Sequence, residues 1–217
     1  MSQKITALRV VVAVTSETAF LEVNGQPCII RAIEGLRVYW PTLPLTIASS
    51  PEMEPSIRTL MSEQRISHEL VLCDPNSPTE LLAALKQGAP HYEAVIFHDA
   101  SRPLIHPELL IRLINSLEAG ADAVRPSIAF TETLKIVRPD GVIRETLDRT
   151  SVRHISSPEV IRTSAIDLKG KLSGWFVPLK KDSRLEQIEG APEGLRINSE
   201  SERDLLESFL HWRQLNV

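Results

Sequence analysis

Short apolar segments that alternate with segments of helical periodicity constrain the fold of this 217-residue chain more than any other feature. The first of them, Leu8 to Val14, is almost continuously apolar and β-branched, which is typical of a strand covered on both faces of a sheet. Four more strand-like segments follow, at residues 43–48, 69–72, 93–98 and 121–127, and the segments with helical spacing are 28–40, 52–64, 77–85 and 107–117. This alternation predicts a parallel sheet whose strands are joined by right-handed helical crossovers.

The alternation of strand-like and helical segments ends after residue 127. Two strand-like segments, 133–137 and 142–146, flank the turn sequence Arg138-Pro-Asp-Gly141 and predict a hairpin. We expect residues 138–155 to form an arm that covers either a neighbouring subunit or a site. Beyond the arm, the pattern predicts a helix over 158–172, strands over 175–177 and 185–188, and a last helix over 200–213. We therefore expect a single domain over residues 1–217, a mainly parallel, helix-flanked α/β sheet with a β-arm.

Composition argues against several classes of partner. The net charge is −4 and 42% of the residues are hydrophobic, so we expect no nucleic-acid partner. No apolar segment approaches the length that spans a membrane, and no signal peptide precedes the first strand. We therefore expect a cytoplasmic protein without a membrane partner. Cys28 and Cys73 lack metal-type spacing and lie in apolar segments, which favours a place in the core for both.

A candidate site follows the fourth strand-like segment. Its apolar residues, Ala94 to Phe97, end in His98, Asp99 and Arg102, and ligands bind at the carboxyl ends of strands in open parallel sheets. An aspartate there could hold a hard cation, and an arginine could clamp a phosphate group. Asp99 and Arg102 could instead form an ion pair that only stiffens the turn. No second histidine or cysteine stands near His98, which favours a hydrogen-bonded turn residue over a metal ligand.

Five short motifs together resemble one known family. They are His98-Asp-Ala-Ser-Arg-Pro103, Thr131-Glu-Thr-Leu-Lys135, Glu145-Thr-Leu-Asp-Arg149, Ser157-Pro-Glu159 and Gly194-Leu-Arg-Ile-Asn198. The first resembles the His-Asp-Ala-Ala-Arg-Pro segment of 2-C-methyl-D-erythritol 4-phosphate cytidylyltransferases. The second and third resemble the Asp-Thr-(Leu/Met)-Lys segment and the (Glu/His)-Thr-(Leu/Val)-Asp-Arg arm of that family. The last two stand where the family has Thr-Pro-Gln and Asn-Ile-Lys-Val-Thr.

The resemblance implies a nucleotidyltransferase with a Rossmann-like sheet. In that family a sugar-alcohol phosphate attacks the α-phosphate of CTP and releases pyrophosphate. By this resemblance, Asp99 would hold Mg²⁺ with Arg102 beside it, and Arg196 would stand in place of a lysine near the phosphates. Such chemistry depends mainly on positioning and on neutralising phosphate charge, so these three residues are the candidate catalytic residues.

The resemblance also implies a homodimer in which the arm contributes to substrate binding. Thr133, Lys135 and Arg149 would bind the acceptor substrate, and the partner subunit's arm would supply Arg149. From the residues alone, Thr133 and Lys135 could equally serve strand pairing. Arg149 could equally form an ion pair with Asp148 or Glu145.

The chain departs from this family immediately after its first strand. The family has there a Gly-rich loop with an arginine and a lysine that bind the triphosphate, whereas Thr15-Ser-Glu-Thr-Ala-Phe20 contains none of these residues. Backbone N–H groups approach phosphate closely where glycines permit it, and the two cations would stabilise negative charge. Arg196 in place of lysine keeps the charge but changes the geometry of a phosphate contact.

Three interpretations follow, and we rank them in this order. The first is a family member whose catalysis is weakened or lost and whose fold, dimer and phosphate site are kept. The second is an active cytidylyltransferase that binds CTP through a rearranged loop and uses this or another polyol phosphate. The third is a non-catalytic dimeric interaction protein that keeps the motifs for structural reasons.

Overall fold

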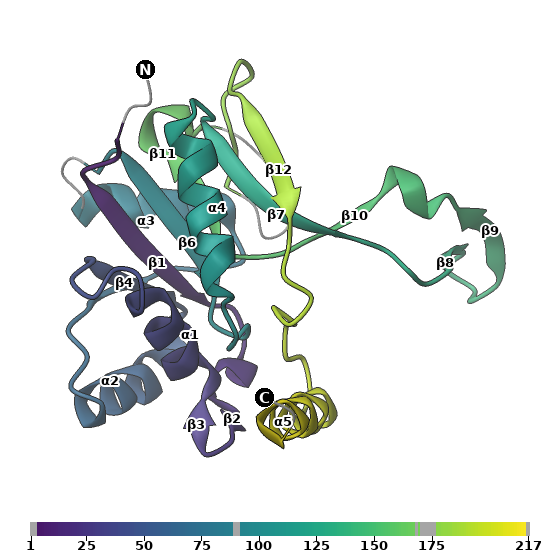
Figure 1. The fold of residues 1–217 in the computed structure, drawn as a ribbon, viewed down its shortest axis with the longest axis horizontal. Helices are drawn as coiled ribbons and strands as arrows, with labels where there is room; N and C mark the ends of the chain where they lie inside the picture. Colours follow the sequence, from purple (N-terminus) through teal and green to yellow (C-terminus); the bar gives the residue numbers. More distant parts are fainter. Residues whose placement is uncertain (1–3, 89–91, 168, 170–176, 216–217) are drawn as a thin grey trace.

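The computed structural model describes residues 4–88, 92–167, 169 and 177–215. Within these residues, β1 (Leu8–Val14) lies in an eight-stranded sheet of order β10-β7-β11-β6-β1-β4-β5, and β12 also pairs with β7 (Figure 1). The other strands are β4 (Leu45–Ser49), β5 (Glu69–Leu72), β6 (Ala94–Asp99), β7 (Ala123–Ala129), β10 (Arg153–Ile155), β11 (Glu159–Arg162) and β12 (Leu185–Glu189). The neighbouring strands β5, β4, β1 and β6 are parallel, and so are β12 and β7. β10 pairs with β7 in the antiparallel sense, and β11 is antiparallel to both of its neighbours, β6 and β7. The predicted class, a mainly parallel, helix-flanked α/β sheet, is confirmed.

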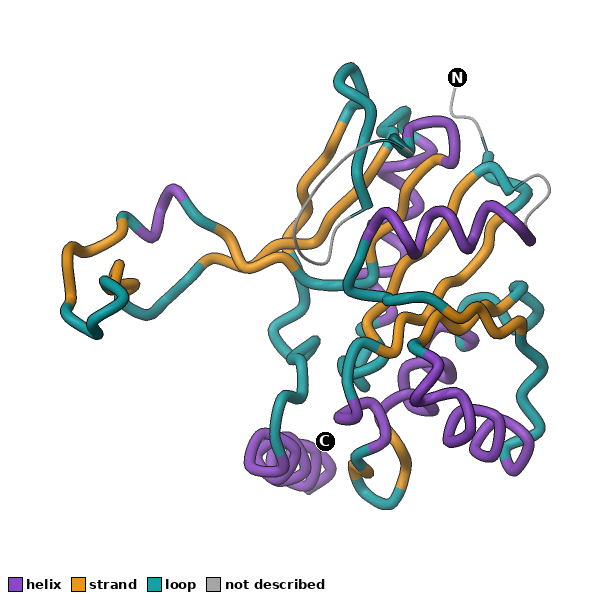
Figure 2. Tube along the Cα trace, turned by 180° about the vertical axis from the view of Figure 1, so that it is seen from behind, coloured by secondary structure: helices purple, strands orange, loops and turns teal. Residues whose placement is uncertain are grey.

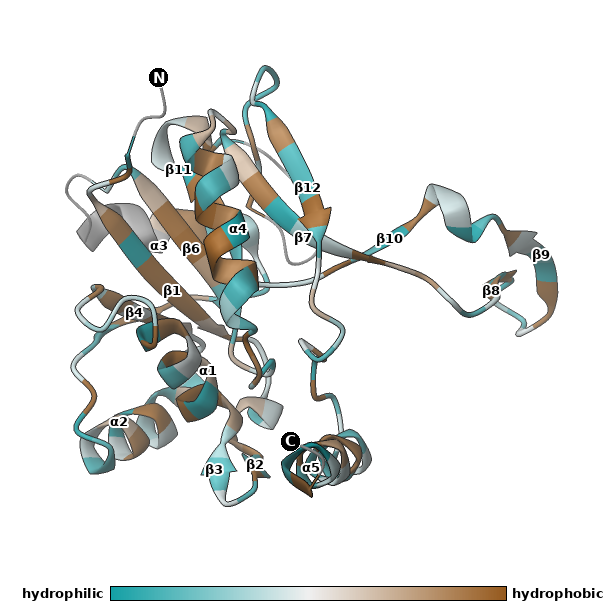
Figure 3. Ribbon diagram, viewed as in Figure 1, coloured by the Kyte–Doolittle hydropathy of each residue, from teal (hydrophilic) through white to brown (hydrophobic). Residues whose placement is uncertain are grey.

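Helices cover both faces of the sheet because its central strands are apolar on both faces. α1 (Cys28–Arg37), α2 (Glu54–Glu63) and α4 (Pro107–Glu118) pack on one face, and α3 (Pro78–Gly88) packs on the other (Figures 1 and 2). In β1, Val10, Val12 and Val14 belong to the first of these two cores, and Val11 belongs to the second. Figure 3 shows the result, with β1 and β6 hydrophobic along most of their length and polar residues on the helices. The four helices predicted within residues 28–117 and the buried strands β1, β4 and β6 are therefore confirmed.

Smaller elements join the sheet to the last helix. Asn24 and Gly25 form the turn between β2 (Glu22–Val23) and β3 (Gln26–Pro27), both with positive φ, as the Asn-Gly pair predicts. α5 (Glu200–Leu215) packs beside this hairpin through Leu206. Cys28 and Cys73 are buried and free, and burial raises the pKa of each thiol to about 11. No helix in the described ranges is both long and apolar enough to cross a membrane.

The helix predicted over 158–172 is wrong where the structure describes it. Glu159–Arg162 is strand β11, which fills the space between β6 and β7, and Thr163–Ala165 is a single 3-10 turn. A short apolar segment does not distinguish a strand from a helix by periodicity, and Glu159 resembles an acidic first-turn residue. Glu159 is instead buried and bonded to Arg125 of β7 at 2.5 Å, and burial raises its pKa. Residues 168 and 170–176 lie outside the described residues, and with them most of the strand predicted over 175–177; Val177 is described and belongs to no strand.

The arm is a separate two-stranded sheet within residues 130–152, not the predicted 138–155, because Arg153–Ile155 is strand β10 of the main sheet. β8 (Leu134–Val137) pairs with β9 (Ile143–Leu147), and both extend away from the main sheet (Figure 1). The Pro-Asp-Gly sequence forms the turn, in which Gly141 has a φ of 82° and Arg138 N–H donates to the Val142 carbonyl at 2.9 Å. A 3-10 turn, Arg149–Ser151, then leads the chain back into the sheet through β10.

His98 ties the end of β6 to the segment before β11. Its Nδ1 lies 3.1 Å from Ser157 Oγ, and its Nε2 lies 2.9 Å from the Arg102 carbonyl. Asp99 N–H donates to Ser157 Oγ at 3.2 Å, so the neutral ring accepts from the Ser157 hydroxyl and donates to the carbonyl. The ring is fully buried, and burial lowers the pKa of His98 to about 4. His98 is therefore a hydrogen-bonded structural residue, as the sequence favours.

The low pKa of His98 predicts that the free energy of unfolding decreases at acid pH. Between the folded pKa of about 4 and the unfolded value of 6.5, the unfolded chain binds more protons, so stability falls as the pH falls through this window. From pH 7 to pH 5 the wild type should lose about 2 kcal/mol more free energy of unfolding than a His98→Asn variant. Urea unfolding at both pH values measures the difference. Equal losses in the two proteins would contradict the assignment.

Candidate active site

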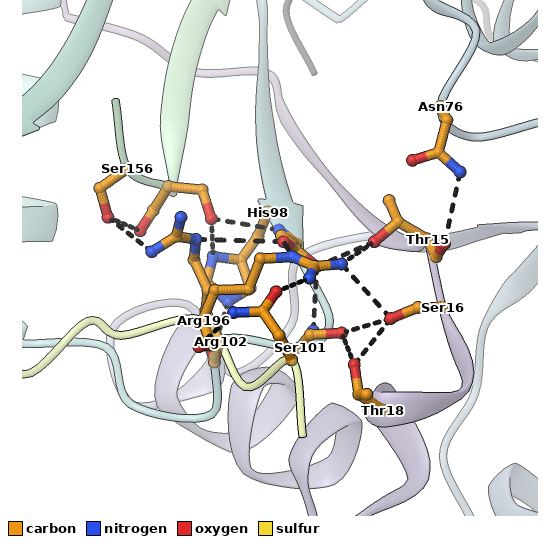
Figure 4. A network of polar contacts seen from close by, with 12 residues as sticks. Thr15, Ser16, Thr18, Asn76, His98, Ser101, Arg102, Ser156 and Arg196 are labelled. Atoms are coloured by element: carbon orange, nitrogen blue, oxygen red, sulfur yellow. Dashed lines mark hydrogen bonds and ion pairs between the residues drawn. The ribbon is translucent and has the colours of Figure 1, made fainter. Parts of the chain in front are cut away.

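Asp99 is the last residue of β6, and its carboxylate is held on both sides. Its partners Thr15, Ser101 and Arg196 are labelled in Figure 4. Oδ1 accepts from Ser101 N–H at 3.0 Å and from Thr15 Oγ1 at 3.3 Å. Oδ2 accepts from Arg196 Nε at 2.8 Å. Only 6% of the side chain is exposed. The carboxylate that the sequence places at the end of this strand is therefore fully engaged within the chain.

Arg102 lies beside Asp99 but bonds mainly elsewhere. Its Nη1 donates to the Gly194 carbonyl at 2.6 Å and lies 3.4 Å from Ser156 Oγ, while its Nε is 4.0 Å from Asp99 Oδ2. Burial lowers the pKa of Arg102, Asp99 opposes that shift and Arg196 adds to it. The ion pair with Asp99 thus exists, but it is the longer of the two that Asp99 makes.

Arg196 joins three segments that are distant in the sequence. Besides Asp99, its guanidinium donates from Nη2 to Thr15 Oγ1 at 3.0 Å and Ser16 Oγ at 3.3 Å, and from Nη1 to Asn198 Oδ1. The backbone holds this segment in place, because Ile197 N–H donates to the Ser101 carbonyl at 2.8 Å. Four of the five N–H groups of Arg196 therefore have partners within the chain.

The segment after β1 closes on itself through short polar side chains. Residues Glu17–Phe20 form a 3-10 turn. Thr18 Oγ1 lies 2.7 Å from Ser16 Oγ and 2.9 Å from Ser101 Oγ. The backbone N–H groups of Ala19 and Leu21 donate to the carbonyls of Ser16 and Thr18. Hydroxyls and internal backbone bonds thus stand where the family resemblance places a Gly-rich loop with two cations.

A pocket of about 290 Å³ opens beside these residues. Its lining combines Asp99, Arg102 and Arg196 with residues at the base of the arm, which are Phe130, Arg153, His154 and Ile155. The rings of Phe130 and His154 stack with centroids 6.0 Å apart. Burial and, secondly, the charge of Arg102 lower the pKa of His154. The pocket therefore combines three arginines with one aspartate.

Sequence reasoning missed four members of this lining, which are Phe130, Arg153, His154 and Ile155. They lie before and after the hairpin, and they meet because β10 pairs with β7. The available signal was the Arg153-His154 pair near the end of the predicted arm. It became interpretable only with the strand pairing known.

The candidate acceptor residues lie outside this pocket within one chain. Lys135 Nζ donates to Thr146 Oγ1 at 2.6 Å across the hairpin, and Arg149 Nη1 donates to the Thr131 carbonyl. Both belong to the arm, which extends away from β6 (Figure 1), and neither these two nor Thr133 line the pocket. No ion pair among the described residues joins Arg149 to Asp148 or Glu145.

A second, larger hollow of about 590 Å³ has the opposite electrostatic character. Glu17, Glu52 and Glu200 lie around it, and Phe20 and Met53 contribute apolar surface. It is lined by no arginine or lysine among the described residues. Carboxylates repel phosphate, so the arginine-lined pocket is the better candidate for a phosphate ligand.

The residues present do not form a ready magnesium site at Asp99. Mg²⁺ needs an octahedral set of oxygen ligands, and no three His, Cys, Asp or Glu side chains in the described part of the chain lie together to offer one. The cationic guanidinium of Arg196 also occupies Asp99 Oδ2. A metal at that oxygen would have to share it with this positive charge at short range.

Comparisons with known proteins agree with the motifs. Residues 11–172 match the family model described as 2-C-methyl-D-erythritol 4-phosphate cytidylyltransferase (IspD). A protein of that name from Nocardia farcinica is 28% identical over 177 residues, which cover 82% of this chain and 75% of the relative. Another from Rhodococcus jostii is 28% identical over 141 residues, 65% of this chain but only 61% of the relative.

Solved structures show the same fold. The crystal structure of 4-diphosphocytidyl-2C-methyl-D-erythritol synthase from Anaerococcus prevotii has a TM-score of 0.75 at 17% identity, over 94% of this chain and 98% of that one. The cytidylyltransferase from Thermus thermophilus has a TM-score of 0.74 at 17% identity, over 95% of this chain and 100% of that one. The chain belongs to the 2-C-methyl-D-erythritol 4-phosphate cytidylyltransferase family.

Proposed function

We propose that this chain is a cytidylyltransferase-family protein in which cytidylyl transfer is weakened or lost, while a phosphate-binding pocket is kept. The observation that carries the proposal is the network joining Asp99, Arg196 and Thr15. It fills the region in which the family would bind the triphosphate of CTP, and it engages the aspartate that would hold Mg²⁺.

The segment after β1 supports the loss of triphosphate binding. A triphosphate needs several donors that are free to point at it, but the N–H groups of Ala19 and Leu21 are already bonded within the turn. The Asn76 amide donates to the Thr15 carbonyl at 3.3 Å, which further fixes the segment. Glu17 brings negative charge into the same turn. These features oppose CTP binding in the family manner.

The pocket beside Asp99 supports the retention of a phosphate ligand. Arg102, Arg153 and Arg196 line it, and arginine suits phosphate because its planar fork donates two parallel hydrogen bonds. A sugar-alcohol phosphate, the acceptor substrate of the family, fits this chemistry. Because Arg196 holds Asp99, we assign no catalytic step to a metal ion on Asp99.

We also propose that the arm pairs two subunits and that Thr133, Lys135 and Arg149 serve the partner subunit's pocket. The arm makes little contact with its own body (Figure 1), and it exposes apolar side chains at Val137, Val142 and Ile143. The most exposed of the three is Ile143, at 61%. An arm that exposes apolar residues in this way would gain stability by packing against a second copy of the chain.

The central prediction concerns turnover. With CTP, methylerythritol phosphate and Mg²⁺, pyrophosphate release should stay at least 100-fold below the roughly 1 s⁻¹ of a slow ordinary enzyme, since losing one preorganised donor costs about 10²–10³ in rate. A coupled pyrophosphate assay measures it, with a family enzyme that carries the Gly-rich loop as positive control.

Turnover of about 1 s⁻¹ or faster, abolished by Asp99→Ala, would show instead that the chain is an active cytidylyltransferase with a rearranged loop. Absence of both turnover and phosphate binding would favour the non-catalytic interaction protein.

The dimer has its own test. Ile143→Asp places a charge on the exposed arm and should shift the protein from dimer to monomer in sedimentation-velocity experiments, because an unpaired charge in an apolar interface is costly. Val38→Asp is the matched control, since Val38 is 70% exposed on the body, outside the arm. It should leave the dimer intact. A wild-type monomer at ordinary assay concentrations would contradict the proposal.

A further inference from the structure

Asp99 and Arg196 meet at the position where the family resemblance places a carboxylate and Mg²⁺. We propose that the Arg196 guanidinium takes the place of a divalent cation in this chain. The pocket then binds the phosphate group of its ligand without a metal ion, and Asp99 is a positioning residue for Arg196. This inference deepens the proposed function and rests on it for the identity of the pocket.

The contacts of Asp99 exclude a simple exchange of Arg196 for a metal. Oδ2 bonds Arg196 Nε at 2.8 Å, while Oδ1 is held by Ser101 N–H and Thr15 Oγ1. A cation approaching Oδ2 would meet the positive guanidinium at short range in a largely buried site. Displacing Arg196 would also break its bonds to Thr15, Ser16 and Asn198. Hydrogen bonds to neighbouring residues therefore hold both partners of the ion pair in place, in addition to their mutual attraction.

The charges that one chain places around the pocket already balance a phosphate. Three arginines and one aspartate line it, so the formal charge is three minus one, or +2 with His154 neutral. A phosphate monoester carries about −1.5 to −2 at pH 7. Addition of Mg²⁺ would overcompensate that charge. The site is already electrostatically complementary to one phosphate group.

Donors remain on the buried Arg102 and on the half-buried Arg196. Arg196 bonds Asp99, Asn198, Thr15 and Ser16 through four N–H groups, which leaves one on Nη1. Arg102 uses Nη1 for Gly194 and Ser156, and no described contact uses its Nη2. Arg153 adds an exposed guanidinium at the rim, where it bonds the carbonyls of its own turn. The pocket thus offers charge-assisted donors from side chains that are already positioned.

The test is calorimetric titration of the full chain with inorganic phosphate, once in excess EDTA and once in excess MgCl₂. We expect the two dissociation constants to agree within about twofold. Arg196→Ala should weaken binding about 10-fold or more, because it removes a charge-assisted donor. Arg196→Lys, which keeps the charge but not the fork, should give an intermediate loss and should still bind in EDTA. Arg58→Ala removes an exposed arginine of α2 outside the pocket and should change nothing.

A second readout addresses the metal directly. Electron paramagnetic resonance measures the fraction of added Mn²⁺ that the protein binds. We expect this fraction to be the same for the wild type and for Asp99→Asn. The inference is overturned if phosphate binds only with Mg²⁺, if it binds under neither condition, or if Mn²⁺ binds the wild type and is lost in Asp99→Asn. Failure of the proposed loss of catalysis is a separate result, because it appears as CTP turnover and not as metal-dependent phosphate binding; absence of phosphate binding under both conditions would overturn both proposals.

Discussion

The ion pair between Asp99 and Arg196 organises the site. The two residues are 97 positions apart in the chain and meet at 2.8 Å. They meet because β6 ends next to β1 in the sheet and because Ile197 N–H donates to the Ser101 carbonyl. The segment after β1, the turn after β6 and the segment before α5 are then closed around one buried carboxylate. Removing either partner would leave a charged group poorly compensated at their junction.

This closure is the basis of the proposal that the chain keeps the family fold and has lost part of the family's chemistry. Short hydroxyl side chains at Ser16, Thr18 and Ser101 bond one another where a nucleotide-binding loop would need open backbone donors. Arg196 engages the carboxylate that would otherwise be available to a cation. The arginine-lined pocket next to them stays open toward the base of the arm. We propose on this basis that the site binds a single phosphate group but not a triphosphate.

Local patterns were sufficient for the parts of the structure that depend on local physics. The β-branched segment Leu8–Val14, the helix opening at Pro107 and the Asn24-Gly25 turn were all predictable. Asp99 at a strand end was predictable for the same reason. β11 was not, because the buried partner that lets Glu159 lie in a sheet is Arg125, 34 residues away. The pairing of Asp99 with Arg196, and the meeting of Phe130 with His154, likewise depend on tertiary contacts that no spacing in the sequence expresses.

The proposed metal-free site requires that Arg196, and not a metal ion, contacts Asp99 when a phosphate ligand is bound. Crystals grown with Mn²⁺ and phosphate, with diffraction data collected at the manganese absorption edge, show this in one experiment. We expect phosphate density against Arg102 and Arg196, an intact contact between Arg196 Nε and Asp99 Oδ2, and no anomalous peak at Asp99. An anomalous peak on Asp99 with Arg196 turned away from it would contradict the account.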